Sequence, residues 1–336
     1  MIKTTMQAIA KKHGVSKVTV SKALNGQPGV SEELRQKIVE TAKTDGYTLK
    51  EKNTDHSLQK VGVLIPQRFF FDYELYYHQI YYALLNESEK RGVELVLSVL
   101  SNQDEQLKIL PYNIEKGNHD VLLLCGEVSD DYYNFLSGLD LKILCIDFYK
   151  LSKNADCVII GNYFAGYLIT SYLISKGHSS IGYIGSKHST SSNSDRYYGY
   201  LKALGKNGLE YRDEWYIPVD NAANPSDIDY SLPEKLPTAL VCHNDHVGFE
   251  VIRILSNRGI KVGEEISVTG FDNLQHSELS IPPLTTMNIN REEIAGNTME
   301  LLFWRINNPD LPPRKIILDT TLIERESVAD LNTGKR

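Results

Sequence analysis

The sequence has few cysteines, and none are spaced as a zinc or redox motif. The four, Cys125, Cys145, Cys157 and Cys242, lie at least a dozen residues apart, so neither a metal cluster nor a disulfide framework is expected. No apolar run reaches 18 residues, and the N-terminal stretch lacks a signal-peptide core. These absences predict a cytoplasmic protein that neither spans a membrane nor is secreted.

The sequence also lacks the motifs of common enzymes. No G-x-G-x-x-G follows the first apolar run, and there is no Walker loop, no G-x-S-x-G and no H-E-x-x-H. The nine histidines are scattered along the chain. We therefore expect no enzyme activity, no cofactor and no metal site.

What is present is an ordinary globular composition with an uneven charge. Hydrophobic residues make up 41% and charged residues 24% of the 336 positions, and this length allows two or three domains. Residues 1–60 hold eleven Lys or Arg against six Asp or Glu, whereas the rest holds 25 against 37. The balance suggests a small part that contacts phosphates and a larger acidic part with another task, although a solvated lysine-rich face would give the same charge.

Three short helical patterns fill the basic segment. Thr5 precedes the first, which Gly14 ends. Ser16 and Ser31 stand where they can cap the second and third. The tight turn between the first two predicts a helix-turn-helix unit. The apolar positions expected to face inward are Met6, Ile9, Ala10, Val20, Ala23, Leu24, Leu34, Ile38, Val39 and Ala42.

The run Gly-Val-Ser-Lys-Val-Thr-Val-Ser-Lys-Ala-Leu-Asn over residues 14–25, followed by Val30-Ser31 and Gly46-Tyr47, resembles the lactose/galactose repressor family of transcription regulators. The resemblance implies a sequence-specific repressor that binds a pseudo-palindromic operator in double-stranded DNA as a homodimer. No leucine heptads follow Ser327, so a dimer is expected and not a tetramer.

In that family the second helix enters the major groove and reads base edges from its first turn. The matching residues here are Lys17, Val18 and Lys22. Family positions that hold the phosphate backbone correspond to Thr5, Ser16, Thr19, Ser21, Asn25, Ser31 and Tyr47. Ser16 and Ser31 are expected both to cap a helix and to face phosphate.

Two positions depart from the family pattern. Lysine at position 22 replaces the usual arginine, so the bidentate fork for guanine is lost and softer discrimination is expected. The linker over residues 48–60 lacks the family's proline, is shorter, and offers only the late Leu58 as a minor-groove wedge. A DNA-kinking hinge helix is therefore less well supported than DNA binding itself.

From Val61 onward, apolar runs alternate with amphipathic stretches, which predicts doubly wound parallel α/β sheets. Strands are expected at 61–65, 93–99, 121–124, 141–146, 157–160, 181–184, 238–242 and 266–271. Helices are expected at 74–90, 104–116, 130–138, 163–176, 195–208, 245–258 and 290–307.

The resemblance extends over this acidic body and implies a two-lobed sensor similar to periplasmic sugar-binding proteins. Its landmarks are Asn162, Gly166, Gly177-His178, Arg196, Gly199, Asn244-Asp245, Gly270-Phe271-Asp272-Asn273, Pro282 to Thr286 and Glu324 to Ser327. The expected organisation is an all-α headpiece over 1–47, a linker over 48–60, and an effector-binding and dimerisation domain over 61–330. Lobe 1 is expected at about 61–160 and 288–318, and lobe 2 at about 161–287 and 319–330.

Sheets of this kind bind ligands at the carboxyl ends of their strands. The candidate effector-binding residues there are Asp147, Arg196, Asn244 and Asp272, whose polar groups can pair with sugar hydroxyls. A salt bridge or a turn cap is the alternative role for each. Phe71, Asp72 and Tyr73, in an aromatic segment that continues with Tyr76 and Tyr77, are also candidates, although such rings can simply pack on the next helix.

The expected effector is a sugar or sugar derivative in the cleft between the lobes. A nucleoside or purine corepressor, or a protein co-effector, is the alternative within the same class. Outside it, a sugar-binding protein or an enzyme on the same fold is opposed by the DNA-binding motif and by the missing leader and enzyme motifs.

Overall fold

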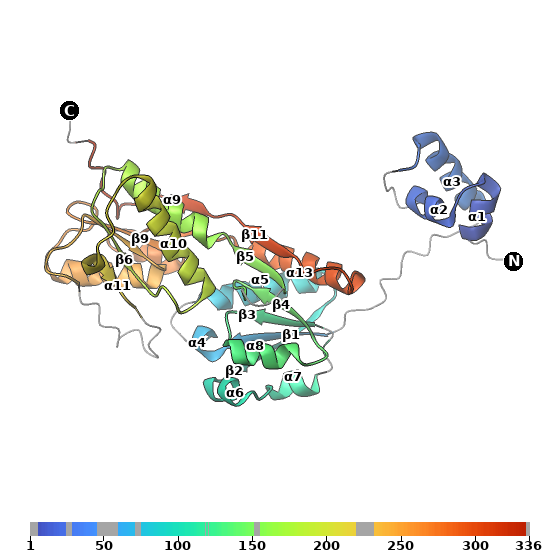
Figure 1. Cartoon of the computed structure of the whole chain (residues 1–336), viewed down its shortest axis with the longest axis horizontal. Coiled ribbons are helices and arrows are strands. Elements are labelled where there is room, and N and C mark those ends of the chain that lie inside the picture. Colours follow the sequence, from blue (N-terminus) through green and yellow to red (C-terminus); the bar gives the residue numbers. More distant parts are fainter. Residues whose placement is uncertain are drawn as a thin grey trace. The chain divides into compact units, whose positions relative to one another are not determined.

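The computed structural model describes residues 6–24, 29–45, 60–70, 75–117, 119, 121–150, 155–219 and 232–333, without the side chains of Met6, Lys17, Val18 and Ser21. The chain divides into two compact units, residues 1–58 and 59–336. Figure 1 shows helices alone in the N-terminal unit and both helices and strands in the C-terminal unit.

The N-terminal unit contains three helices, α1 (Met6–His13), α2 (Lys17–Leu24) and α3 (Glu32–Thr44). Gly14 ends α1 with a left-handed φ of 63°, a conformation that glycine adopts without strain. The helices enclose a small core to which each contributes two buried apolar residues. These residues are Ile9, Ala10, Val20, Ala23, Ile38 and Ala42.

Lobe 1 of the C-terminal unit is built on a six-stranded parallel sheet in the order β11-β5-β4-β3-β1-β2. The strands are β1 (Lys60–Pro66), β2 (Glu94–Leu100), β3 (Val121–Cys125), β4 (Lys142–Ile146), β5 (Asp156–Ile160) and β11 (Lys315–Leu318). The helices of this lobe are α4 (Gln67–Phe70), α5 (Tyr76–Lys90), α6 (Asn102–Leu107), α7 (Tyr112–Lys116), α8 (Asp130–Ser137) and α13 (Arg291–Asn307). The inner strands β1, β3 and β5 are almost wholly buried, because helices cover both faces of the sheet, whereas the edge strands β2 and β11 are partly exposed.

Lobe 2 carries the second six-stranded sheet, ordered β12-β10-β9-β8-β6-β7. Adjacent strands in this sheet run parallel, except that β12 is antiparallel to β10. The strands are β6 (Ile181–Ile184), β7 (Tyr216–Ile217), β8 (Ala239–Cys242), β9 (Ser267–Asp272), β10 (Thr285–Asn288) and β12 (Thr321–Ile323). The helices are α9 (Asn162–Ser175), α10 (Ser191–Lys206), the 3-10 turn η1 (Asp213–Trp215), α11 (Asp245–Asn257) and α12 (Gln275–Leu279). Apolar clusters fill both sides of this sheet.

The chain passes between the two lobes three times. The passages lie between β5 and α9, between β10 and α13, and between β11 and β12. Each lobe is therefore assembled from segments that are far apart in the sequence. Three adjacent connections allow the lobes to rotate against each other as bodies.

The predicted fold class is confirmed: two doubly wound, largely parallel α/β lobes accompany a helix-turn-helix unit. The prediction of one helix over 104–116 is wrong, because Pro111 stands at the N-cap of α7 and separates it from α6. The short strands β7, β10, β11 and β12 were not predicted. Among the described residues, no helix is long and apolar enough to cross a membrane.

Candidate functional site

In the N-terminal unit, Ser16 holds the start of α2. The backbone N–H of Thr19 donates to Ser16 Oγ over 3.1 Å, and the two hydroxyls are 2.9 Å apart. Ser16 thus caps the helix as predicted. The capping prediction for Ser31 is wrong: it occupies the N-cap position of α3, but its side chain makes no cap hydrogen bond and is exposed.

The end of α2 is held by a residue that the sequence reasoning missed. Arg35 on α3 donates from Nη1 to the carbonyls of Lys22 and Ala23, over 3.2 and 3.1 Å. These carbonyls lie in the last turn of α2, where backbone acceptors lack helical partners. Arg35 therefore fixes α2 against α3, while the Lys22 side chain stays exposed.

Several predicted DNA contacts fall where the structure gives no side chain. Lys17, Val18 and Ser21 lie on α2, but their side chains are not described. The remaining contacts that lie outside the described residues are Thr5, Asn25 and Tyr47.

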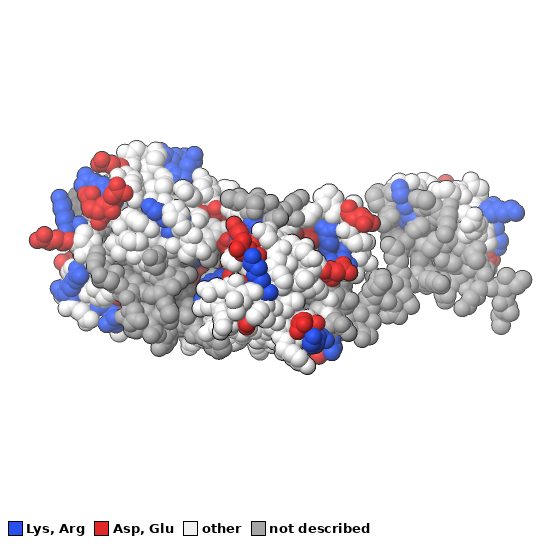
Figure 2. Space-filling view, turned by 60° about the horizontal axis from the view of Figure 1, so that its bottom comes forward, with Lys and Arg blue, Asp and Glu red and all other residues white. Residues whose placement is uncertain are grey.

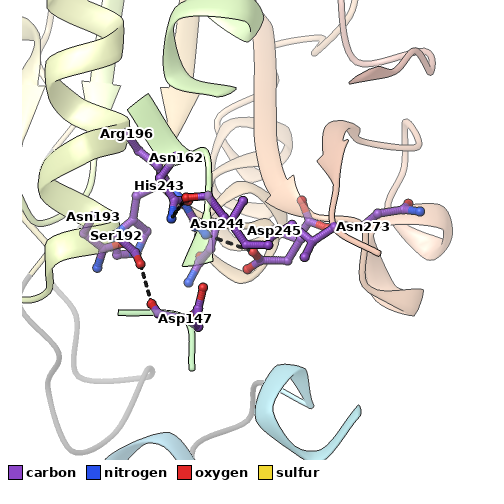
Figure 3. Close-up of polar contacts among 12 residues, drawn as sticks. Asp147, Asn162, Ser192, Asn193, Arg196, His243, Asn244, Asp245 and Asn273 are labelled. Carbon is purple, nitrogen blue, oxygen red and sulfur yellow. Dashed lines mark hydrogen bonds and ion pairs between the residues drawn. The ribbon is translucent and has the colours of Figure 1, made fainter. Parts of the chain in front are cut away.

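In the C-terminal unit, polar side chains from both lobes gather where strands end (Figure 3). Asp147 follows β4 of lobe 1, while Asp272 ends β9 and Asn244 follows β8 of lobe 2. Arg196 reaches the same place from α10. The structure thus brings together all four candidates predicted from strand ends, and each is at most 8% exposed.

Two of these carboxylates sit on strained backbone. Asp147 has a φ of 65° and Asp272 a φ of 101°, in the left-handed region that residues with a Cβ rarely occupy. Such conformations persist where the surrounding structure requires them, which is often at binding sites.

Arg196 is the centre of the polar cluster. Its Nε donates to Asn162 Oδ1 over 2.7 Å, and Nη1 donates to the backbone carbonyl of His243 over 2.6 Å. Nη2 donates to Asp272 Oδ1 over 3.3 Å. These contacts hold the guanidinium in one orientation. Arg196 and Asp272 form a salt bridge, which was the role considered for them besides effector binding.

A lobe 1 side chain binds one carboxylate oxygen of Asp147, and the other oxygen has no hydrogen bond from the described residues. Tyr77 donates its hydroxyl to Asp147 Oδ2 over 2.9 Å, whereas Oδ1 is buried without a hydrogen-bond partner among the described residues. Burial raises the pKa of Asp147 to about 6, against the opposing effects of Arg196 and the Tyr77 hydroxyl. The Tyr76 hydroxyl faces the same carboxyl group and also lowers its pKa, but it is buried and reaches no partner at hydrogen-bond distance among the described residues.

Residues 243–245 of lobe 2, next to this cluster, mainly stabilise the fold. Asn244 Oδ1 accepts from the backbone N–H of Val247 and so caps α11, the alternative role considered for it. Burial, with Arg196 and His246, lowers the pKa of His243 to about 3, so this ring is neutral. Burial also raises the pKa of Asp245, which accepts from the Leu274 N–H over 2.8 Å.

Direct hydrogen bonds join the lobes beside this cluster. Ser192 Oγ donates to the backbone carbonyl of Asp147 over 2.7 Å, and the Ser191 N–H donates to Glu127 Oε2 over 2.6 Å. The Tyr149 hydroxyl donates to the Asp195 carboxylate, with distances of 3.0 and 3.1 Å to its two oxygens. The start of α10 is therefore one part of lobe 2 that hydrogen bonds hold against lobe 1. The end of β9 is another, because Arg291 of α13 donates to the backbone carbonyl of Asp272.

The candidates Phe71, Asp72 and Tyr73 lie outside the described residues. Tyr76 and Tyr77 come next along the chain and do reach Asp147 or its surroundings. The aromatic segment in the sequence signalled them, but it did not show which rings turn inward. Nothing in the sequence singled out Ser192.

Two family models match the chain. One, described as "Bacterial regulatory proteins, lacI family", covers residues 5–49, and the other, described as "Periplasmic binding protein-like domain", covers residues 170–328. The first contains all three helices of the N-terminal unit. The second covers most of lobe 2 together with α13 and β11.

Full-length relatives and solved structures are similar along nearly the whole chain. The HTH-type transcriptional repressor PurR of Mannheimia succiniciproducens is 27% identical over 96% of this chain and 98% of the relative. The PurR of Pasteurella multocida is 28% identical over the same shares. A transcriptional regulator CelR–cellobiose complex matches with a TM-score of 0.70 at 24% identity, covering 97% of this chain and all of that one. A lac repressor dimer bound to operator and the anti-inducer ONPF matches with a TM-score of 0.68 at 20% identity, covering 97% and 99%.

Proposed function

Because the chain belongs to the lacI family of bacterial regulatory proteins, and is a DNA-binding transcription repressor and not an enzyme, we propose that a small molecule held between its lobes controls its affinity for operator DNA. The observation that carries this proposal is the incomplete polar cluster at the strand ends. Asp147 Oδ1 and the Tyr76 hydroxyl are buried there without partners among the described residues. Buried polar atoms normally have partners.

We propose a neutral, hydroxyl-bearing effector, with a sugar or sugar derivative as the first candidate. A carboxylate oxygen can only accept, whereas a tyrosine hydroxyl can donate or accept. One ligand hydroxyl that donates to Asp147 Oδ1 and accepts from Tyr76 would complete both. The Arg196–Asp272 pair would then orient the ligand from lobe 2.

A purine or nucleoside is the second candidate. The relatives that match over nearly their full length carry the name PurR. Aromatic rings also stand beside Asp147, since Tyr77 lies 5.2 Å from Phe69 and 5.1 Å from Tyr76, centroid to centroid. Rings in this position could stack on a base.

We propose that the protein acts as a homodimer in which Lys17, Val18 and Lys22 read base edges. The contacts to phosphate are proposed for Thr5, Ser16, Thr19, Ser21, Asn25, Ser31 and Tyr47. Two helices related by a two-fold axis read two half-sites, which a single short helix cannot do.

A thermal-shift screen of the full chain tests the effector proposal. Carbohydrates, nucleosides and purine bases are added one at a time, because a ligand that binds the folded state raises its melting temperature. Each hit is then added to an operator gel shift. A hit whose influence on DNA binding survives in both Asp147→Asn and Arg196→Ala would show that the ligand site lies elsewhere.

A further inference from the structure

A pocket of about 480 Å³ opens at the junction of the two lobes. Lobe 1 lines it with the segments that follow β1, β2, β3 and β4, and lobe 2 contributes Ser189. The pocket has the size of a small-molecule site. None of the residues assigned to the effector cleft, Asp147, Arg196, Asn244 and Asp272, lines it.

The charged residues of this pocket are paired with one another. Arg68 Nη1 lies 2.6 Å from Glu105 Oε2. Lys150 Nζ lies 3.1 Å from Glu127 Oε1 and 2.8 Å from Asp130 Oδ1. Two cations and two carboxylates thus line the pocket, and Asp130 pairs with Lys150 from outside the lining. Because both lining cations are already paired, an anionic or a cationic ligand would have to displace an existing pair.

The surface of the C-terminal unit also carries both basic and acidic side chains. On the face drawn in Figure 2, basic and acidic side chains alternate and do not gather into a field of one sign. Such a surface does not concentrate charged ligands.

The groups left to contact a ligand are amides and hydroxyls. The exposed Asn102 and Gln106 make no side-chain hydrogen bond to the described part of the chain. Ser129 Oγ accepts from the Tyr132 N–H, and Ser189 Oγ accepts from Asn193 Nδ2. Each hydroxyl can therefore donate its own hydrogen outward.

We propose that this pocket is a second ligand site, which binds a neutral polyhydroxylated compound such as a free sugar or sugar alcohol. Amides and hydroxyls each offer both donors and acceptors, which matches the dual character of ligand hydroxyls. The proposal does not depend on which molecule fills the effector cleft.

Occupancy of this pocket is coupled to the arrangement of the lobes. Glu127 holds Lys150 with one carboxylate oxygen and accepts from the Ser191 N–H of α10 with the other. A ligand that touches Ser129 of lobe 1 and Ser189 of lobe 2 binds best when the lobes stand as described here. It therefore stabilises this arrangement by its differential affinity.

Saturation-transfer NMR on the full chain, with D-glucose and sorbitol as probes and inorganic phosphate as competitor, tests the proposal. At least one polyol should bind saturably, and phosphate should not displace it. The double variant Asn102→Leu/Gln106→Leu should weaken binding about ten-fold or more, since each replacement removes hydrogen bonds to the ligand. Gln103→Leu, an exposed position on the same helix outside the pocket, is the matched control and should leave the affinity unchanged.

Asp147→Asn separates the two sites. Polyol binding that survives Asp147→Asn and is lost in Asn102→Leu/Gln106→Leu supports the pocket. Loss in Asp147→Asn alone places the sugar in the effector cleft, which overturns this second site and leaves the proposed function standing. Displacement by phosphate, or no saturable binding of either polyol, also overturns the proposal.

Discussion

At the scale of a residue, Asp147 combines a left-handed backbone, a buried carboxylate and a raised pKa. A carboxyl group whose pKa is raised by folding binds protons more tightly in the folded state. The free energy of unfolding then falls as the pH rises from the unfolded pKa near 4 to the folded pKa of about 6. Above about pH 6 the full destabilisation remains. Burying this carboxylate at the proposed effector site therefore lowers the stability of the fold near neutral pH.

Asp147→Asn should raise the free energy of unfolding at pH 7.5 by about 1–3 kcal/mol, because the amide removes the cost of burying a charge. The gain should be smaller at pH 5. Urea unfolding at the two pH values measures both, with the exposed Asp140→Asn as control. An equal effect at both pH values would contradict the link between this carboxylate and stability.

Lys22 is exposed on α2, and we propose that it reads a base edge. Lys22→Ala should cost about 1–3 kcal/mol on the preferred operator and change the preference at one base pair, because lysine donates to guanine in the major groove. Selection from randomised operators measures the preference. Lys11→Ala removes an exposed lysine from α1 and should leave it unchanged. An unaltered preference in Lys22→Ala would refute base readout by this residue.

At the scale of an element, α2 depends on α3 for its position. Arg35→Ala removes two hydrogen bonds to the last carbonyls of α2 and should destabilise the N-terminal unit by about 1–3 kcal/mol. Operator affinity should fall equally for all sequences, with faster hydrogen exchange along α2. Lys37→Ala, which breaks only an exposed pair with Glu33, is the control. A changed base preference would instead make Arg35 a reader of DNA.

The start of α10 depends on lobe 1 in a similar way. Tyr149→Phe removes the hydroxyl that joins the lobes through Asp195. We expect local opening there to become easier by about 1–2 kcal/mol, hence roughly ten-fold faster exchange of the amides at 191–195. The exposed Tyr82→Phe serves as control. Unchanged exchange would show that this contact does not hold the lobes.

The sequence predicted most elements but few of the contacts between them. Strands β1 to β6, β8 and β9 and most of the long helices follow from apolar runs and helical periodicity. The strands β7, β10, β11 and β12 were missed. β7 has only two residues, and β10 and β12 carry one and two apolar side chains, which give no apolar run. The link between Glu127 and Ser191 spans 64 residues, and no local pattern reports such a contact. The strand-end rule did bring Asp147, Asn244 and Asp272 together, yet it could not show that Arg196 would bind Asp272 or that Asn244 would cap a helix.

At the scale of the whole molecule, the basic N-terminal unit and the acidic remainder predict strongly salt-dependent DNA binding. Log K should fall linearly with log salt, with a slope of about −0.9 for each phosphate neutralised. Gel shifts of the full chain over a salt series give the slope, and the mass of the complex gives the number of chains. Salt-independent binding, or single chains on half-sites, would contradict dimeric operator recognition.

The order of strands in lobe 1 also has a consequence for synthesis on the ribosome. The edge strand β11 pairs with β5 across more than 150 residues of intervening chain, and α13, which packs against α5, is made late as well. All three helices of the N-terminal unit lie within residues 1–58, so this unit can fold while translation continues. Lobe 1 must wait almost until release, with the edge of β5 open to pairing with other chains. A nascent chain arrested before residue 315 should therefore aggregate, although its DNA-binding unit is already folded.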